Sequence, residues 1–197
     1  MSSASSDTTL RPATPDDAAA IARIYAHHVL HGTATFEEVP PDPAEIARRI
    51  ASVLDRGLPY LVALAENRLL GYAYAGPYHA RSAYRFTLED SIYLDPAATG
   101  RRIGTRLLDR LLAEATAIGA RQLVAVIGDS GNAASIALHA RAGFAHVGTM
   151  CSVGLKFGRW LDTVAMQRAL GPGDLSVPAD QTSTGSATCA PTPNTRL

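Results

Sequence analysis

SIYLDPAATGRRIGTRLL, residues 91–108, joins a strand, a glycine-containing loop and a helix. The helix is expected to begin at about Ile103, with Gly100 and Gly104 on either side of its start. The first backbone N–H groups of a helix have no partner inside the helix, so they attract anions, and the two arginines of the loop add positive charge. The segment therefore fits a phosphate-binding turn. A plain strand-to-helix turn with two solvated arginines fits the local pattern equally well.

The same loop differs from two common phosphate-binding motifs. It has no Lys-Ser/Thr pair, which a Walker loop needs to reach phosphate and magnesium. It also lacks the Gly-x-Gly-x-x-Gly pattern of dinucleotide-binding folds. The sequence therefore disfavours both of those nucleotide-binding classes.

Helical and strand patterns alternate along the chain, which predicts a mixed α and β fold. YLVALAE (60–66) and LLGYAYAG (69–76) flank an Asn-Arg turn and predict an antiparallel hairpin. Asn132 is expected to cap a helix that ends at Gly143. The expected helices are 14–30, 43–56, 103–119 and 132–143, and the expected strands are 10–13, 60–66, 69–76, 86–95, 123–128 and a final pair within 144–168.

Composition limits the class of protein. The chain has 197 residues, 47% of them hydrophobic, which is enough for one domain with a sizeable core. Its 18 basic and 18 acidic side chains give no net charge, which argues against a nucleic-acid or anionic-membrane surface. No apolar run approaches the roughly 20 residues of a membrane span, and MSSASSDTTL lacks the features of a secretory signal, so we expect a cytoplasmic protein. Cys151 and Cys189 are the only cysteines, and we expect both to be reduced.

The two ends of the chain differ in composition from its centre. We expect a flexible N-terminus at residues 1–9 and one domain at 10–170. Residues 171–197 are rich in Ser, Thr, Pro and Gly and have little to bury, which predicts a disordered tail.

Two carboxylates interrupt the predicted strand FTLEDSIYLD at 86–95. An ionised carboxylate inside a sheet must find partners or change its pKa, so strands are poor in Asp and Glu. Strand alternation turns Glu89 and Asp90 to opposite faces of the sheet. A structural ion pair between Glu89 and Arg81 or Arg85 is one explanation, and a catalytic carboxylate is the other.

Three histidines raise the question of a metal. His27 and His31 are one helical turn apart, and His28 lies beside them. A zinc site needs three or four ligands, and no carboxylate or cysteine set completes one nearby. We therefore expect no metal.

The loop, its Ile-Tyr-Leu strand and NAASIALHARAGF (132–144) together resemble the GNAT superfamily of N-acetyltransferases. AYAGPYHARSAY (73–84) and GLKFGRWLD (154–162) look like the phosphinothricin and methionine-sulfoximine branch of that superfamily. The resemblance runs from about Leu10 to Ala169. It implies the GNAT fold, an α+β domain whose central, mostly antiparallel twisted sheet has a splayed pair of strands and is flanked by helices.

The resemblance also implies acetyl-CoA as co-substrate. The main chain of Ile92, Tyr93 and Leu94 would bind the pantetheine arm as an added strand does. Thr99 and Arg102 stand where the family usually has Arg and a second Gly. Asn132 falls where the family places a cofactor contact, although a helix cap explains it equally well. The residues expected to hold the pyrophosphate are Thr99, Gly100, Arg101, Arg102, Ile103, Gly104 and Thr105.

In the resembling enzymes a carboxylate at the position of Glu89 is the general base that deprotonates the amine. His139 stands where the wider family carries Tyr, the proton donor to the CoA thiolate, and a satisfied helix histidine is the alternative. Because a thiol has a pKa near 8.5, CoA can leave as thiolate at little cost, so His139 should matter less than Glu89. Asp90 is expected to be a structural acceptor. The residues expected to meet the acceptor substrate are His79, Arg81, Tyr84, Glu89, Asp90 and Ser91.

Other aromatic residues fit packing or binding. HGTATFEE (31–38) resembles the substrate-side loop of the family, where Phe36 would wall the pocket or simply pack. Phe157 and Trp160 are expected in a core or a subunit contact, and the resemblance implies a homodimer.

The leading hypothesis is an N-acetyltransferase that moves the acetyl group of acetyl-CoA to phosphinothricin, methionine sulfoximine or methionine sulfone. A second hypothesis keeps the chemistry but changes the acceptor to an ordinary amino acid, a polyamine or a protein N-terminus. A third is a non-catalytic acyl-CoA-binding module, against which the presence of both Glu89 and His139 argues. None of the three needs nucleic acid, membrane or metal.

Overall fold

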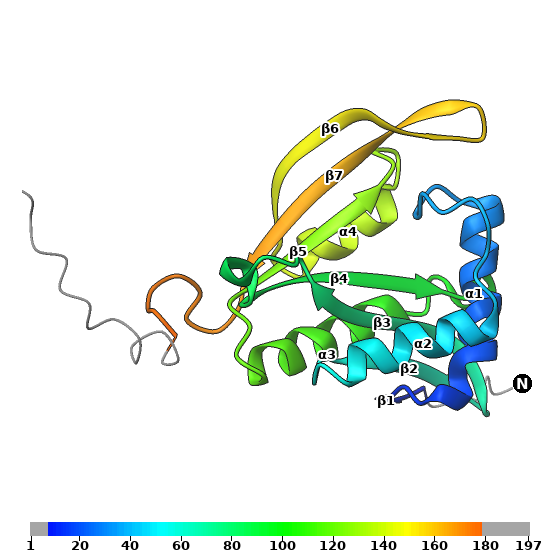
Figure 1. Ribbon diagram of the computed structural model, residues 1–197. Coiled ribbons are helices and arrows are strands. Elements are labelled where there is room, and N and C mark those ends of the chain that lie inside the picture. Colours follow the sequence, from blue (N-terminus) through cyan, green and yellow to red (C-terminus); the bar gives the residue numbers. More distant parts are fainter. Residues whose placement is uncertain (1–7, 179–197) are drawn as a thin grey trace, which may run out of the picture.

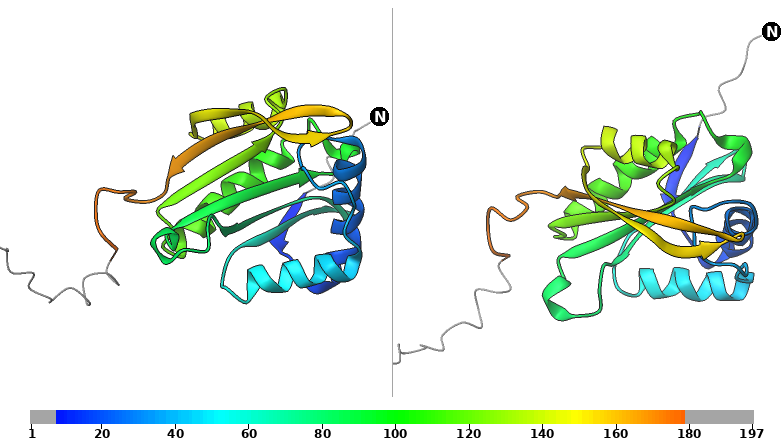
Figure 2. Two further views of the ribbon diagram at one scale, coloured as in Figure 1. Left: turned by 45° about the horizontal axis from the view of Figure 1, so that its top comes forward. Right: turned by 90° about the horizontal axis from the view of Figure 1, so that it is seen from above.

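A seven-stranded sheet in the order β1-β2-β3-β4-β5-β7-β6 forms the centre of the computed structural model, which describes residues 8–178 (Figure 1). Helices cover both of its faces (Figure 2). The strands are β1 Thr9–Pro12, β2 Tyr60–Ala65, β3 Arg68–Pro77, β4 Thr87–Leu94, β5 Gln122–Gly128, β6 Ala145–Lys156 and β7 Arg159–Ala169. The α-helices are α1 Ala18–His31, α2 Pro43–Leu54, α3 Ile103–Ala117 and α4 Ala133–Arg141. Short 3₁₀ turns occupy Pro15–Asp17, Ser82–Tyr84 and Pro96–Ala98.

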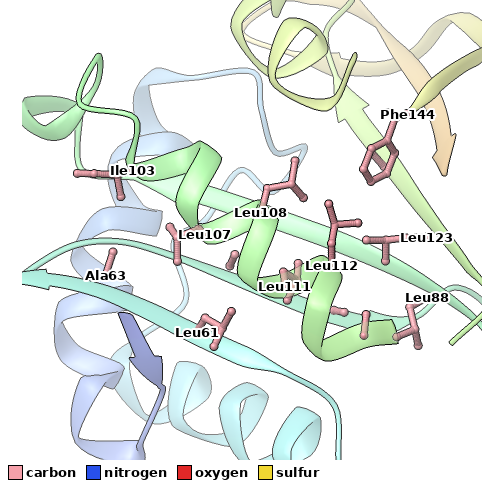
Figure 3. Packing of buried hydrophobic residues seen from close by; sticks show 14 of the residues in the cluster. Leu61, Ala63, Leu88, Ile103, Leu107, Leu108, Leu111, Leu112, Leu123 and Phe144 are labelled. Carbon is pink, nitrogen blue, oxygen red and sulfur yellow. The ribbon is translucent and has the colours of Figure 1, made fainter. Parts of the chain in front are cut away.

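The two faces of the sheet bury two separate clusters. On one face α3 inserts its leucine stripe, including Leu107, Leu108 and Leu111, against Leu61 and Leu123 (Figure 3). On the other face α1 and α2 bury Ile21, Ile24, Ile46 and Ile50 against tyrosines of β2 and β3. Because successive strand residues point to opposite faces, the apolar runs of β2 and β3 supply both clusters.

The parallel pair β4–β5 gives the sheet its opening. These strands pair only from Thr87 opposite Gln122 to Asp90 opposite Ala125. Beyond that point each strand continues without pairing to the other, so the two strands diverge. All other neighbours in the sheet are antiparallel. The predicted fold, a mostly antiparallel sheet with a splayed pair, is confirmed.

Element boundaries differ from the predictions by a few residues. The hairpin turn lies at Glu66–Asn67, where both residues have positive φ, and not at Asn67-Arg68. The predicted helix from 14 starts as the 3₁₀ turn Pro15–Asp17, with Thr14 and Asp17 in a reciprocal capping box. Asn132 caps α4 as predicted, since its side-chain oxygen accepts a hydrogen bond from the Ser135 N–H at 3.2 Å.

The end of the domain continues a short way past β7. Residues 171–178 form turns, and the Arg121 guanidinium donates to Gly173 O and Ser176 Oγ at 3.3 and 3.2 Å. Cys151 is exposed and forms no disulfide within residues 8–178. The other expectations for 1–7 and 179–197, including Cys189, lie outside the described residues. Within residues 8–178 no helix is both long and apolar enough to cross a membrane.

Candidate active site

A cavity of about 490 Å³ opens where β4 and β5 diverge. Its walls come mainly from β4, the loop before α3 and the start of that helix, the end of β5, and α4. Every residue predicted to bind the cofactor lines it except Arg101. Those that do are Ile92, Tyr93, Leu94, Thr99, Gly100, Arg102, Ile103, Gly104, Thr105 and Asn132.

The backbone of β4 turns hydrogen-bonding groups into this cavity. Asp95 N donates to Leu70 O and Thr87 O accepts from Tyr78 N, so the odd-numbered residues of β4 face β3. By alternation the backbone N–H and C=O groups of the even-numbered residues point toward β5, and β5 no longer pairs with β4 beyond Asp90. The backbone of Ile92 is therefore placed to pair with an extended ligand, as an additional strand would.

The start of α3 forms the anion-binding end of the cavity. Arg102 is in the left-handed conformation at the N-cap position, and its side chain makes no capping hydrogen bond to the first turn. The N–H groups of that turn thus keep the capacity to bind an anion. Gly104 sits under the loop, where a Cβ would be 3.4 Å from Leu138 Cδ2 and 3.6 Å from Leu94 Cδ1. These are ordinary contact distances, so a methyl group would fit at this position.

Asp90 and His139 form a buried pair at the inner end of the cavity. His139 Nε2 lies 3.0 Å from Asp90 Oδ2, and Nδ1 lies 2.8 Å from Ser135 O. Both partners accept hydrogen bonds when the carboxyl is ionised, so the pair suits a doubly protonated imidazolium. Burial lowers the pKa of His139, but the hydrogen bond and charge of Asp90 and the Ser135 carbonyl outweigh it, so the pKa is raised. Asp90 Oδ1 is the one buried side-chain polar atom of residues 8–178 without a partner.

Glu89 lies on the opposite face of β4 and is half-buried. Burial raises its pKa, and the neighbouring charge of Asp90 raises it further. Within residues 8–178 Glu89 makes no ion pair, so the structural explanation through Arg81 or Arg85 is not what the structure shows. An unpaired carboxylate with a raised pKa is suited to accept a proton.

The predicted acceptor residues fall in three places. Asp90 and Ser91 line the cavity, and Glu89, beside Asp90 on β4, does not. His79, Arg81 and Tyr84 lie together on the β3–β4 connection, also outside the cavity. The rings of His79 and Tyr84 are 4.9 Å apart. Arg81 is exposed. The structure therefore does not bring these three side chains into the cavity of the described residues.

His28 is a cavity residue that the sequence did not reveal. Its Nε2 lies 2.8 Å from Leu94 O, and burial lowers its pKa, so the neutral ring donates to this carbonyl. The bond fixes the end of β4. Among the described residues no group of three His, Cys, Asp or Glu side chains is arranged to hold a metal ion. In the sequence, His28 stands beside His27 and His31, and this grouping suggested only the question of a metal site, not a hydrogen bond to β4.

A model of the acetyltransferase (GNAT) family matches residues 22–144 of the chain. The chain belongs to the GNAT family. It is 58% identical over 170 residues to the phosphinothricin N-acetyltransferase of Alcaligenes faecalis, with 86% of each chain covered. It is 40% identical to the L-methionine sulfoximine/L-methionine sulfone acetyltransferase of Salmonella typhimurium, over 82% of this chain and 94% of the relative.

The solved structures agree with this GNAT assignment. The crystal structure of a GNAT phosphinothricin acetyltransferase from Sinorhizobium meliloti, in complex with acetyl-CoA, has a TM-score of 0.85 at 49% identity. The match covers 88% of this chain and 94% of that chain. The GNAT acetyltransferase resemblance of the sequence is thereby confirmed.

Proposed function

We propose that this GNAT protein moves the acetyl group of acetyl-CoA to the amino group of phosphinothricin, methionine sulfoximine or methionine sulfone. The observation that carries the proposal is the 58% identity, over 86% of both chains, to a phosphinothricin N-acetyltransferase. The relatives named for methionine sulfoximine and sulfone support the other two acceptors.

The chemistry of the cavity wall supports acetyl-CoA as the co-substrate. The free N–H groups at the start of α3 and the side chain of Arg102 suit the pyrophosphate. The unpaired backbone of Ile92 suits the amides of the pantetheine arm. When bound, acetyl-CoA supplies an acetyl group activated as a thioester.

The residues around the cavity have the properties that amine acetylation requires. An ammonium cannot attack a thioester, so the amine must first lose a proton, and we assign its acceptance to Glu89, which forms no ion pair within residues 8–178 and whose pKa is raised by burial and by Asp90. The backbone N–H groups at the splayed end of β4 suit the oxyanion. The His139 imidazolium, held by Asp90, keeps positive charge near the departing sulfur. Its two N–H groups point at Asp90 and Ser135 O, so a proton passing from His139 to the thiolate would travel through Asp90.

The acceptor is proposed to meet Glu89 from the face of β4 opposite His139. His79, Arg81 and Tyr84 remain candidates for its carboxylate or phosphinate, because they lie on the segment directly before the Glu89 strand. An arginine fork can bind either group bidentately.

We also propose that the protein is a homodimer through β6. This strand is an edge of the sheet, and large apolar side chains are exposed on it, on its turn to β7 and at the start of β7. These are Val147, Met150, Val153, Leu155, Phe157 and Trp160. Light scattering after size exclusion should give a dimer mass for the wild type and a monomer mass for a Val153→Asp, Leu155→Asp variant. A monomeric wild type at micromolar concentration would exclude the dimer.

A competition experiment tests the choice of acceptor. The protein is mixed with limiting acetyl-CoA and an equimolar pool of the three analogues, methionine, glutamate, spermidine and a short peptide. Product ratios by mass spectrometry then equal the ratios of kcat/KM. We expect the three analogues to take most of the acetyl groups. Dominance of spermidine or the peptide would replace the proposal with a different acceptor class.

A further inference from the structure

Lys156, at the end of β6, is the single lysine among the 18 lysine and arginine residues of the chain. It is also one of the most deeply buried side chains, with 2% of its surface exposed. Charged side chains are almost never this buried unless they are paired. Neither the chemistry of the site nor the core packing described above uses it.

The Lys156 ammonium is satisfied by backbone carbonyls of one loop. Nζ donates to Gly32 O at 2.9 Å and to Thr35 O at 2.7 Å, and it lies 5.0 Å from the centre of the Phe157 ring. Burial lowers its pKa, while the charges of Glu38 and Glu37 act in the opposite direction. Two converging carbonyls suit a compact ammonium better than the wide planar fork of arginine. This requirement explains a lysine in a chain that otherwise uses arginine.

The loop that Lys156 holds, residues 32–37, is called the acceptor loop here. Other contacts fix the same loop from different elements. Thr33 Oγ1 donates to Asp129 Oδ2 at 2.9 Å, and Tyr25 OH lies 2.8 Å from Thr35 Oγ1. The Phe36 ring fills the space above Gly154, where a Cβ would come within 2.3 Å of it.

The acceptor loop reaches the face of β4 that carries Glu89. Ala34 lines the cavity, and Tyr25, whose hydroxyl lies 2.8 Å from Thr35 Oγ1, packs edge-on against Tyr93 of β4 with ring centroids 5.0 Å apart. The charges of Glu89 and Glu37 both act on Tyr74, which lies opposite Ser91 in the β3–β4 pairing. The loop, Ser91 and Glu89 therefore belong to one surface.

We propose that Lys156 is a positioning residue that fastens the acceptor loop to β6 and so sets the amine-binding side of the site. This role of Lys156 in amine binding rests on the proposed acetyl transfer. Without the ammonium, two buried carbonyls lose their donor, and the loop must move to regain hydrogen bonds from water. The proposed acetyl-CoA site lies along β4 and the start of α3, and Ala34 is the only residue of the acceptor loop that lines that cavity, so acetyl-CoA binding should change much less than amine binding.

Hydrogen exchange tests the fastening without any substrate. In Lys156→Met the amides of residues 33–38 should exchange at least tenfold faster than in the wild type, while those of 99–105 stay unchanged. Arg110→Met, which removes an exposed cation paired with Glu114 on α3, is the matched control and should change neither segment. Unchanged exchange at 33–38 in folded Lys156→Met would overturn the proposal.

Steady-state kinetics then test the functional consequence. Lys156→Met should raise KM for the amine by about tenfold, keep KM for acetyl-CoA within about twofold, and lower kcat less than it raises the amine KM. Equal changes in both KM values, or no change in the amine KM, would overturn it. If exchange at 33–38 accelerates but no amine is turned over even by the wild type, the proposed function fails and the fastening stands.

A wild-type measurement covers the case in which Lys156→Met does not fold. Because Lys156 is the only lysine, an amine-reactive ester can modify one side chain, and peptide mass spectrometry separates it from the N-terminus. We expect the native protein to react at Lys156 at least 100-fold more slowly than the unfolded chain. Equal modification rates of Lys156 in the native and unfolded states would contradict its burial against the acceptor loop.

Discussion

His139 Nε2 lies 3.0 Å from Asp90 Oδ2, in a pair that is buried at the inner end of the cavity. This contact joins a strand of the splayed pair to the helix beside it. It also favours the charged ring, because the two nearest partners of the ring nitrogens, the Asp90 carboxylate and Ser135 O, both accept hydrogen bonds.

Asp90→Asn should lower the pKa of His139 from above its ordinary 6.5 to below it, because burial then acts without the opposing carboxylate. The ring-proton NMR titration of His139, assigned with His139→Gln, measures this shift. Because the pKa of His139 is higher in the folded than in the unfolded state, protonation of His139 stabilises the fold. This stabilisation is fully present below about pH 6.5 and is lost as the pH rises through the folded-state pKa. The unfolding free energy that Asp90→Asn costs should therefore shrink from pH 6 toward pH 9. A cost that grows over this range would contradict a charged His139.

Gly104→Glu should weaken acetyl-CoA binding at least tenfold, because it puts bulk and negative charge at the anion-binding start of α3. Gly104→Ala is the control, since its Cβ meets only Leu138 and Leu94 at 3.4 Å or more. Calorimetric titration of acetyl-CoA measures both variants. Equal affinities for wild type and Gly104→Glu would place the pyrophosphate elsewhere.

Arg81→Lys should raise KM for the amino acid by about tenfold, equivalent to about 1.4 kcal/mol, and leave KM for acetyl-CoA unchanged. The reason is loss of the bidentate fork while the charge stays. Arg56→Lys, at an exposed arginine after α2, is the control. Identical kinetics for Arg81→Lys and wild type would remove Arg81 from the acceptor site.

The fall of kcat/KM at low pH should report the pKa of Glu89. Because burial and Asp90 raise its pKa above the ordinary 4.5, activity should fall as pH drops through a value above 4.5. Asp90→Asn removes one of the two causes, so it should move this fall to lower pH. Initial rates between pH 4.5 and 8 measure it. A fall that moves to higher pH in Asp90→Asn would contradict the assignment.

The sequence predicted the fold well because its signals were local. The stripe of α3 and the Asn132 cap each depend on residues close in the chain, and both were found where expected. The splay came from family resemblance, since strand pairing between β4 and β5 depends on tertiary contacts. The hairpin turn lies one residue before its predicted position, at Glu66–Asn67 and not at Asn67-Arg68. Asn67 belongs to both possible turns, so the local sequence did not distinguish between them.

The functional site was predicted less completely, for the same physical reason. The strand pattern identified Glu89 and Asp90 as anomalous, but not that Asp90 would pair with a histidine 49 positions away. Nothing local predicted the bond from His28 to Leu94 O. Lys156 did leave a signal in composition, as the only lysine of an arginine-rich chain.

The most direct test of the central claim is the rate of CoA thiol release with saturating acetyl-CoA and each of L-phosphinothricin, L-methionine sulfoximine and L-methionine sulfone. Wild type should release thiol with at least one of them and place the acetyl group on the amino nitrogen. Glu89→Gln should be about 100- to 10,000-fold slower in kcat, with acetyl-CoA affinity unchanged, because it keeps the shape of the side chain but removes the proton acceptor. No thiol release with any of the three, or equal rates for wild type and Glu89→Gln, would contradict the account.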